Sequence, residues 1–278
     1  MNKSTIGRIV SRGATVASQV APGLAERTLA QLFTTPQRRR VSDREARWMS
    51  GVTRSAVRFD DRRDLAVYEW GEGPTVLLVH GWSSRASQLA LYVAPLLERG
   101  FRVVAFDAPS HGDSDGRRSN LPELATAVQR VAEARGPITA ILAHSLGTAA
   151  TTLALSRGVD ARRVVYLAPP EDLPRYLARL AARIGFGEDI APRAQRRLER
   201  HFDLPFEQAR GGHLAPSLRV PLLVFHDERD HEVPVDEGRN LVARWPGARL
   251  RTTHGLGHNR IVRDPAVVEE ALAFLAAA

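Results

Sequence analysis

The feature that most constrains the fold is an alternation of short apolar runs with helical segments, from about residue 55 onward. One run, TVLLVHG over residues 75–81, is continuously apolar and ends in glycine, which is typical of a strand buried on both faces. Connections of a few residues separate the strands from the helices, so neighbouring strands should run parallel. The sequence therefore predicts an α/β fold, with a mostly parallel sheet and helices on both faces.

Seven further stretches are predicted as strands, and the first two should form an antiparallel hairpin. They are residues 55–59, 64–70, 102–109, 138–145, 162–170, 220–230 and 249–258. Residues 171–216 interrupt the alternation with two or three amphipathic helices. An insertion between strands at this point predicts a small helical lid.

Composition excludes several classes of site. The chain lacks cysteine, which rules out disulfides, thiol catalysis and thiolate metal ligands. Its nine histidines show no His-x-x-x-His spacing on a predicted helix, so we expect no metal site built from protein ligands. No apolar run approaches the roughly 20 residues that a membrane-spanning helix needs. These features fit a cytoplasmic location.

The positive charge is concentrated at the beginning of the chain. Nine basic and three acidic residues give residues 1–50 six of the eight net positive charges, and the remaining residues are nearly balanced. Because 38 of the 39 basic residues are arginine, the excess looks like a coding preference, and we expect no nucleic-acid partner. Residues 1–50 are predicted as a basic helical segment, and residues 51–278 as the main domain.

Two hypotheses fit the N-terminal segment. Apolar residues recur at helical spacing on both sides of the Pro22-Gly23 break. The favoured hypothesis is a pair of packed helices, with Ile9, Val10 and Val16 buried. The alternative is a weak membrane-surface contact through residues 1–33, made by a basic amphipathic face.

A serine follows one of the predicted buried strands in the stretch ILAHSLGTAA, residues 141–150. Ser145 lies between the small residues Ala143 and Gly147, as a tight strand-to-helix turn requires. In a parallel sheet, functional groups collect at the carboxyl ends of the strands. A serine hydroxyl becomes a good nucleophile when a base accepts its proton and an acid orients that base. We therefore expect a base and an acid further along the chain.

The serine stretch resembles the nucleophile elbow of the α/β-hydrolases, Gly-x-Ser-x-Gly, with alanine in place of the first glycine. The resemblance covers residues 55–278 and implies an α/β-hydrolase fold. It also implies the chain order nucleophile, acid, histidine. The stretch FHDERDHEVP resembles the family's Gly-x-x-Asp-x-x-Val-Pro and makes Asp230 the acid. Asp227 is the rival, and its other interpretation is a turn residue or a helix cap.

The stretch THGLGHNRI offers two candidates for the base. His258 follows a flexible Gly-Leu-Gly and resembles the family's Gly-His before a helix, so we choose it. His254 is interpreted as a strand-end histidine that faces the sheet or solvent.

The resemblance also implies how an oxyanion would be held. The stretch VHGWSS resembles the His-Gly-x loop after the third strand, so the backbone N–H groups of Trp82 and Leu146 are the expected donors. His80 is expected to shape that loop. The stretch FDAPSHGDSDG resembles the family's Asp-x-x-Gly-His-Gly-x-Ser turn, in which a histidine supports the floor of the site. The residues that fit this turn are Asp107, His111, Gly112 and Ser114, with Ser110 in the glycine place.

Together these features predict a serine hydrolase that acts on a carboxylic ester or thioester through an acyl-enzyme, without a cofactor. Ser145 is the expected nucleophile, His258 the base and Asp230 its partner. The expected partner molecule is a small acyl substrate. One alternative is an acyltransferase or perhydrolase that uses the same acyl-enzyme. Another is a non-catalytic binding protein on this fold, against which the complete triad argues.

Overall fold

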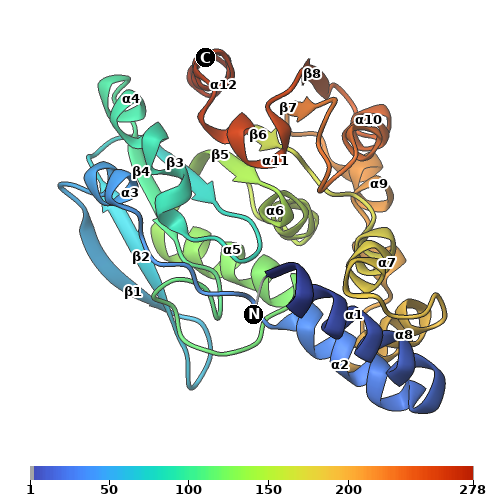
Figure 1. Ribbon diagram of the computed structural model, residues 1–278. Coiled ribbons are helices and arrows are strands. Elements are labelled where there is room, and N and C mark those ends of the chain that lie inside the picture. The colour runs from blue at the N-terminus through green and yellow to red at the C-terminus, as the bar shows by residue number, and fades with distance from the viewer. Residues whose placement is uncertain (1–2, 278) are drawn as a thin grey trace. The chain divides into compact units, whose positions relative to one another are not determined.

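The computed structural model describes the backbone of residues 3–277 and the side chains of residues 12–277 (Figure 1). Within this range the strands form one eight-stranded sheet in the order β1-β2-β4-β3-β5-β6-β7-β8. The strands are β1 (Thr53–Arg58), β2 (Asp64–Trp70), β3 (Thr75–Val79), β4 (Arg102–Phe106), β5 (Ile138–His144), β6 (Arg163–Leu167), β7 (Leu222–Asp227) and β8 (Arg249–Thr253). Strand β2 pairs antiparallel with β1 and β4, and all other pairs are parallel. The predicted α/β fold with a mostly parallel sheet is confirmed.

Helices connect the strands and cover the sheet. The helices are α1 (Lys3–Val20), α2 (Pro22–Thr34), α3 (Asp43–Trp48), α4 (Val93–Glu98), α5 (Leu121–Arg135), α6 (Leu146–Ser156), α7 (Leu173–Ile184), α8 (Ile190–Phe202), α9 (Gly211–Leu214), α10 (Val235–Arg244), α11 (Gly257–Arg260) and α12 (Pro265–Ala276), with the 3₁₀ turns η1 (Ala86–Tyr92), η2 (Phe206–Ala209), η3 (Ala215–Ser217) and η4 (Ile261–Arg263). Local signals set several of their beginnings. The side chains of Asn120 and Asp264, for example, accept backbone N–H groups at the first turns of α5 and α12.

The core follows from the two-residue repeat of the strands. In β3, Val76 and Leu78 are fully buried on one face, where they cluster with α4 and α12. Leu77, on the opposite face, is also fully buried. Helices α5 and α6 cover that face (Figure 1). Burial on both faces explains why the central strands are continuous apolar runs.

The chain divides into two compact units. The helical unit comprises Met1–Thr35 and Asp172–Arg210, and the sheet unit comprises Pro36–Glu171 and Gly211–Ala278. Residues 36–50 and 211–216 thus group with the sheet. The prediction from the sequence differs, because it places residues 36–50 in the N-terminal segment and residues 211–216 in the lid.

The helical unit joins the two N-terminal helices to the two helices predicted as a lid. The ring of Phe33 in α2 lies 6.1 Å from the rings of Tyr176 and Phe206. In α1, the Ser18 hydroxyl accepts the backbone N–H of Gly187 at 2.9 Å. Segments more than 140 residues apart in sequence therefore share one small core.

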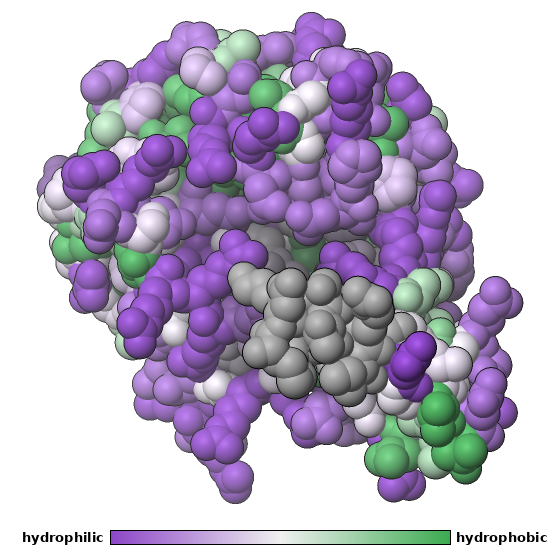
Figure 2. Space-filling view, in the orientation of Figure 1, coloured by the Kyte–Doolittle hydropathy of each residue, from purple (hydrophilic) through white to green (hydrophobic). Residues whose placement is uncertain are grey.

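The buried face of α1 differs from the face that the favoured hypothesis expects to be buried. Ala14 and Ser18 are buried, but Val16 is 55% exposed, so the expectation that Val16 is buried is wrong. The side chains of Ile9 and Val10 lie outside the described residues. Val16, Val20 and Leu24 leave an apolar patch where α1 meets α2, which is green in Figure 2. No described helix is long and apolar enough to cross a membrane.

Candidate active site

Ser145 occupies the turn between β5 and α6. Its backbone has φ 51° and ψ −131°, an unfavourable conformation that costs a non-glycine residue about 1–3 kcal/mol. The Ser145 N–H donates to the Leu167 carbonyl of β6 at 2.9 Å, and the Thr148 N–H donates to the Ser145 carbonyl at 2.8 Å. A strained residue held this firmly at the end of a buried strand indicates a functional position.

Small neighbours make this turn possible. A Cβ atom at Gly147 would come within 2.5 Å of the His80 carbonyl oxygen and 2.7 Å of the Val79 carbonyl oxygen. A larger residue would therefore push α6 away from the loop after β3. Ala143, which replaces the first glycine of the motif, is fully buried in the extended strand β5. Alanine is unstrained there, so the departure from the motif leaves the turn intact.

Ser145, His258 and Asp230 form a hydrogen-bonded series. The Ser145 Oγ lies 2.8 Å from His258 Nε2, and His258 Nδ1 lies 2.8 Å from Asp230 Oδ2. An ionised carboxylate only accepts hydrogen bonds, so Nδ1 carries the imidazole proton. The lone pair of Nε2 then faces the serine hydroxyl, which is the arrangement that proton transfer from serine requires.

Asp230 is held in its ionised form. Its Oδ1 accepts the backbone N–H groups of Glu232 at 2.8 Å and Val233 at 2.9 Å. Burial raises the pKa of this carboxyl, but the hydrogen bond to His258, the electrostatic attraction to that ring and the two N–H groups outweigh burial. The net effect lowers the pKa of Asp230 below its ordinary value. Asp230 is therefore a fixed carboxylate at neutral pH.

Asp227, the rival acid, bonds to the loop that carries His258. Its Oδ2 accepts the Thr253 hydroxyl at 2.8 Å and the Leu256 N–H at 2.9 Å, and its Oδ1 accepts the Arg229 N–H at 2.9 Å. Burial raises the pKa of Asp227, but these hydrogen bonds prevail and lower it to about 2. Asp227 therefore fixes the loop, and Asp230 is the carboxylate that bonds to the His258 imidazole.

His254, the other candidate base, lies at the surface. Its side chain is 60% exposed, and its Nδ1 is 3.4 Å from Glu228 Oε2. The structure thus brings His258 to Ser145 and leaves His254 facing solvent.

Two buried histidines that the sequence did not single out support the series. His144 donates from Nε2 to the His258 carbonyl at 3.0 Å, and the two rings are 4.9 Å apart. His226 Nε2 donates to the Val233 carbonyl at 2.9 Å and lies 3.7 Å from Asp230 Oδ2. Each ring fixes the backbone of a loop that carries a member of the series. The sequence signal that could have indicated one of these rings is the position of His144 directly before Ser145.

Two backbone N–H groups, one at the serine turn and one in the loop after β3, are free to bind an anion. The N–H groups of Trp82 and Leu146 make no hydrogen bond within the described part of the chain. The loop that carries Trp82 approaches the serine closely, because a Cβ atom at Gly81 would lie 2.8 Å from the Ser145 Cβ. Leu146 is the first residue of α6, where the helix dipole favours negative charge. These donors have the chemistry that an oxyanion requires.

His80 shapes the loop before Trp82. Its Nε2 accepts the Ala108 N–H at 2.9 Å, and its Nδ1–H donates to the Gly81 carbonyl at 2.7 Å. Both ring nitrogens are occupied, so the ring has none free for proton transfer. This geometry fits the structural role expected for His80.

The turn after β4 is built around Asp107, which is fully buried. Its carboxylate accepts the N–H groups of Ala86 and Asp113, each at 2.7 Å. A Cβ atom at Gly112 would overlap that carboxylate. Ser110, which stands in the family's glycine place, has φ 69° and carries backbone strain that glycine would avoid.

His111 and Ser114 complete this turn. The Ser114 hydroxyl donates to the Asp107 carbonyl and accepts the Ala66 N–H at 2.8 Å, which ties the turn to β2. His111 Nδ1–H donates to the Pro109 carbonyl at 2.9 Å. Its ring meets the Trp82 ring edge-on at 4.9 Å, so this turn supports the loop that carries Trp82.

Buried histidines predict a loss of stability in mild acid. Burial lowers the pKa of His80 to about 4 and those of His111 and His144 to about 3. In the unfolded chain these rings bind protons below about pH 6.5. Between about pH 6.5 and 4 the unfolded state therefore binds more protons, and stability falls by about 1.4 kcal/mol per pH unit for each ring.

The measurement is the urea midpoint of unfolding at pH 7.5 and pH 5.0, which should be markedly lower at pH 5.0. His111→Asn should reduce this dependence by about one proton. Equal midpoints at the two pH values would contradict the prediction.

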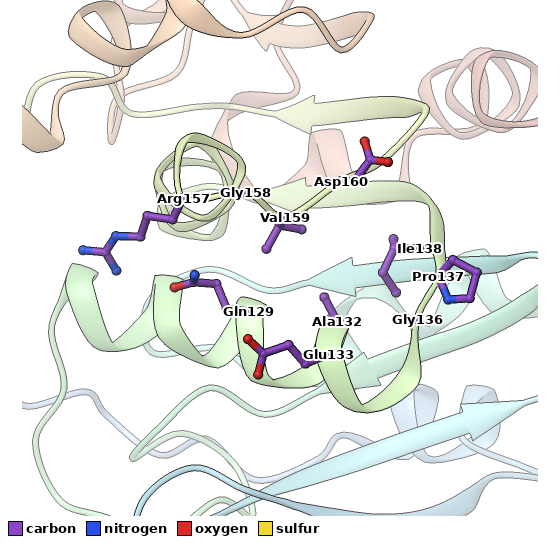
Figure 3. Close-up of a pocket in the computed structure, with 10 residues that line it drawn as sticks. All are labelled: Gln129, Ala132, Glu133, Gly136, Pro137, Ile138, Arg157, Gly158, Val159 and Asp160. Atoms are coloured by element: carbon purple, nitrogen blue, oxygen red, sulfur yellow. The ribbon is translucent and has the colours of Figure 1, made fainter.

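A cavity of about 260 Å³ lies at the end of the central strands that is opposite to Ser145 (Figure 3). It is lined by Ile138, where β5 begins, and by Arg157, which follows α6. Ser145 lies at the other end of both elements. This cavity is therefore separate from the hydrogen-bonded series. Within the described residues, no group of three or more potential ligands could hold a metal ion.

Known structures share this architecture. The Pyrococcus furiosus esterase Pf2001 is 21% identical, with a TM-score of 0.65 over 87% of this chain and 96% of that one. An esterase from Exiguobacterium antarcticum is 14% identical, with a TM-score of 0.63 over 81% and 100% of the two chains. A membrane phospholipase A, described as a bacterial virulence factor, is 18% identical, with a TM-score of 0.63 over 99% and 98%. At these identities the likeness concerns the fold.

The family is established by a match to the sequence itself. No curated protein sequence matches the chain. The profile of the "Alpha/beta hydrolase family" matches residues 76–271, which is more than half of the chain. The resemblance predicted from the serine stretch is thereby confirmed, and the chain belongs to the alpha/beta hydrolase family.

Proposed function

We propose that this hydrolase cleaves a carboxylic ester or thioester through an acyl-enzyme on Ser145. The observation that carries the proposal is the continuous series from the Ser145 hydroxyl through His258 to Asp230, with 2.8 Å at each step. The similar structures named as esterases and as a phospholipase give further support. No cofactor is needed for this chemistry.

In the first half-reaction, Ser145 Oγ attacks the acyl carbonyl carbon while His258 Nε2 accepts the hydroxyl proton. Asp230 stabilises the imidazolium that forms and keeps its orientation. The tetrahedral intermediate then collapses, the bond to the leaving group breaks, and His258 delivers its proton to the departing alcohol or thiol. In the second half-reaction, water repeats these steps on the acyl-enzyme and releases the carboxylic acid.

The negative charge on the carbonyl oxygen would be held by the Trp82 and Leu146 N–H groups. Preorganised donors of this kind contribute about 3–4 kcal/mol each to the stabilisation of the transition state. Because both donors belong to the backbone, no side chain has to become ordered to place them. The loops around His80 and Asp107 supply the rigidity that this role needs.

The proposal is tested by labelling the chain with a fluorophosphonate probe, which reacts with an activated serine whatever the substrate. Labelling of wild type supports the proposal, and its absence would overturn it. A panel of chromogenic esters from acetate to palmitate then identifies the acyl chain. Labelling without turnover of any ester or thioester would favour acyl transfer over hydrolysis.

Replacement of the two aspartates separates their roles. In Asp230→Asn an amide nitrogen can face His258 Nδ1, which favours the tautomer with the proton on Nε2, and the serine loses its proton acceptor. We expect kcat to fall by about ten-thousandfold. Asp227→Asn should instead loosen the histidine loop, with a lower melting temperature and a much smaller loss of kcat. Equal losses of kcat would leave Asp230 without its assigned role.

The N-terminal helices are proposed to stabilise the helical unit, and membrane contact is the alternative. Deletion of residues 1–22 removes the α1 contacts to Gly185 and Gly187, so the melting temperature should fall by several degrees. Binding to anionic vesicles should be weak in both forms. Salt-sensitive vesicle binding that the deletion abolishes, with an unchanged melting temperature, would favour the membrane contact of residues 1–33.

We propose a cytoplasmic location for this chain, which has no cysteine.

A further inference from the structure

A cavity of about 340 Å³ lies within the sheet unit and is lined by three segments of the chain. The first contains α3 and the residues before it, the second begins η1, and the third follows His258 through α11 and η4. This volume is at the lower end of the range for small-molecule sites. The cavity thus suits one compact ligand rather than a polymer.

Four arginines without an acidic partner line this cavity. They are Arg39, Arg40, Arg44 and Arg263, and none of their guanidinium groups makes an ion pair or hydrogen bond within the described residues. Glu45 is the one acidic residue of the lining, and its Oε2 accepts both the N–H and the hydroxyl of Ser42. The four arginines and this carboxylate leave a net charge of about +3, which is a large share of the +8 of the chain.

A fifth arginine of the lining is already neutralised. Arg85 lies 2.9 Å from Asp113 and 3.6 Å from the buried Asp107. It therefore contributes shape to the cavity and little free charge. Arg85 thus has carboxylate partners, whereas the other four arginines of the lining are exposed and are available to a ligand.

The same cavity has an apolar side. Trp48 and Leu91 are partly buried, Val262 is 2% exposed, and all three line the cavity. A guanidinium rim beside an indole ring suits a ligand with an anionic group joined to a planar or apolar part. Inorganic anions alone would leave the apolar side unused.

The cavity adjoins the segments that carry the proposed chemistry. Asn259, in its lining, is the residue after His258, and Ser84 follows Trp82 by two residues. A ligand held here would lie beside the histidine helix and the loop of the expected oxyanion donor. We propose that this cavity binds the phosphate group of an amphipathic phosphate ester, as a subsite next to Ser145. Only the link to a substrate of Ser145 rests on the proposed function.

Phosphate matches the number and type of donors better than a carboxylate does. Arginine presents several N–H donors in a planar fork, which pairs with phosphate oxygens through two parallel hydrogen bonds. A phosphate monoester offers three oxygens and up to two negative charges, so it can engage arginines from separate segments at once. A single carboxylate would leave most of the positive charge unbalanced.

The test is calorimetric binding of phenyl phosphate and of inorganic phosphate to the full chain at low and high salt. Phenyl phosphate should bind more tightly than inorganic phosphate, because its ring can occupy the apolar side of the cavity, and binding should weaken as salt rises. Arg44→Ala with Arg263→Ala, from two separate segments, should weaken binding by about tenfold or more. The matched control is Arg62→Ala with Arg117→Ala, which removes the same charge from exposed positions outside the cavity and should leave binding unchanged.

Each outcome decides the proposal. Loss of binding in the cavity variant alone supports it, and equal loss in both variants would overturn it by showing a general charge effect. Vesicles that contain phosphatidic acid form a second arm, and binding to them through the same arginines identifies a lipid as the source of the phosphate. Absence of binding to every phosphate probe would overturn the proposal. Calorimetry needs no turnover, so a failure of the proposed hydrolysis leaves this result interpretable.

Discussion

Replacing Ser145 with alanine should abolish ester hydrolysis and labelling by a fluorophosphonate. The variant lacks the only oxygen that the proposed mechanism places against the acyl carbon, so kcat should fall by about ten-thousandfold or more. Among the residues that the structure describes, the Ser145 hydroxyl bonds to His258 and to no backbone group, and alanine experiences the same strained backbone. The melting temperature should therefore stay close to that of wild type.

Ser156→Ala is the matched control, because it makes the same chemical change at the other end of α6. Its hydroxyl donates to the Leu153 carbonyl, and its loss should leave activity and labelling unchanged. Activity above a few per cent of wild type in Ser145→Ala would show that another group is the nucleophile. Labelling that persists in Ser145→Ala would lead to the same conclusion.

The sequence could predict the candidate site because its members stand at the ends of strands. A parallel sheet brings these ends to one edge whatever the details of the helices, so Ser145, Asp230 and His258 could be expected at that edge. Their chain order and their small neighbours then carried the assignment. The mutual distances came from the structure, since they depend on side-chain rotamers and loop paths.

Other parts of the site depend on contacts that no local pattern encodes. Asp227 stands three residues before Asp230 in the same stretch, and only the path of the loop after β8 decides which carboxylate reaches the imidazole. His144 bonds to the backbone of His258, 114 residues away, a pairing without a sequence signal. Composition could not separate these roles.

The N-terminal helices show the same limit. Helical spacing correctly indicated α1 and α2, together with the break near Pro22. The spacing did not reveal which face is buried, because the partner of α1 is the turn after α7, far along the chain. Ala14 and Ser18 are buried where the larger Val16 was expected, and a Cβ atom at Gly187 would lie 3.3 Å from Ser18 Cβ, so the turn approaches α1 closely there.

Replacing His258 with alanine should reduce kcat about as severely as the loss of the serine, by roughly ten-thousandfold. Without the imidazole, the Ser145 hydroxyl has no acceptor for its proton and Asp230 loses the hydrogen bond to its Oδ2. Free imidazole in the assay buffer should restore part of the activity, because it can enter the space that the side chain leaves. Restoration of this kind would not follow from a purely structural role.

His254→Ala is the control for this variant, since it removes the same ring four residues earlier in the same loop. Its side chain is exposed and meets Glu228 at 3.4 Å, so kcat should change less than about twofold. The comparison is made with a soluble ester at a pH where both variants are folded, as checked by circular dichroism. A severe loss of kcat in His254→Ala with a mild one in His258→Ala would reverse the assignment of the base. The contacts of His258 would then position the loop, and His258 would not be the group that accepts the serine proton.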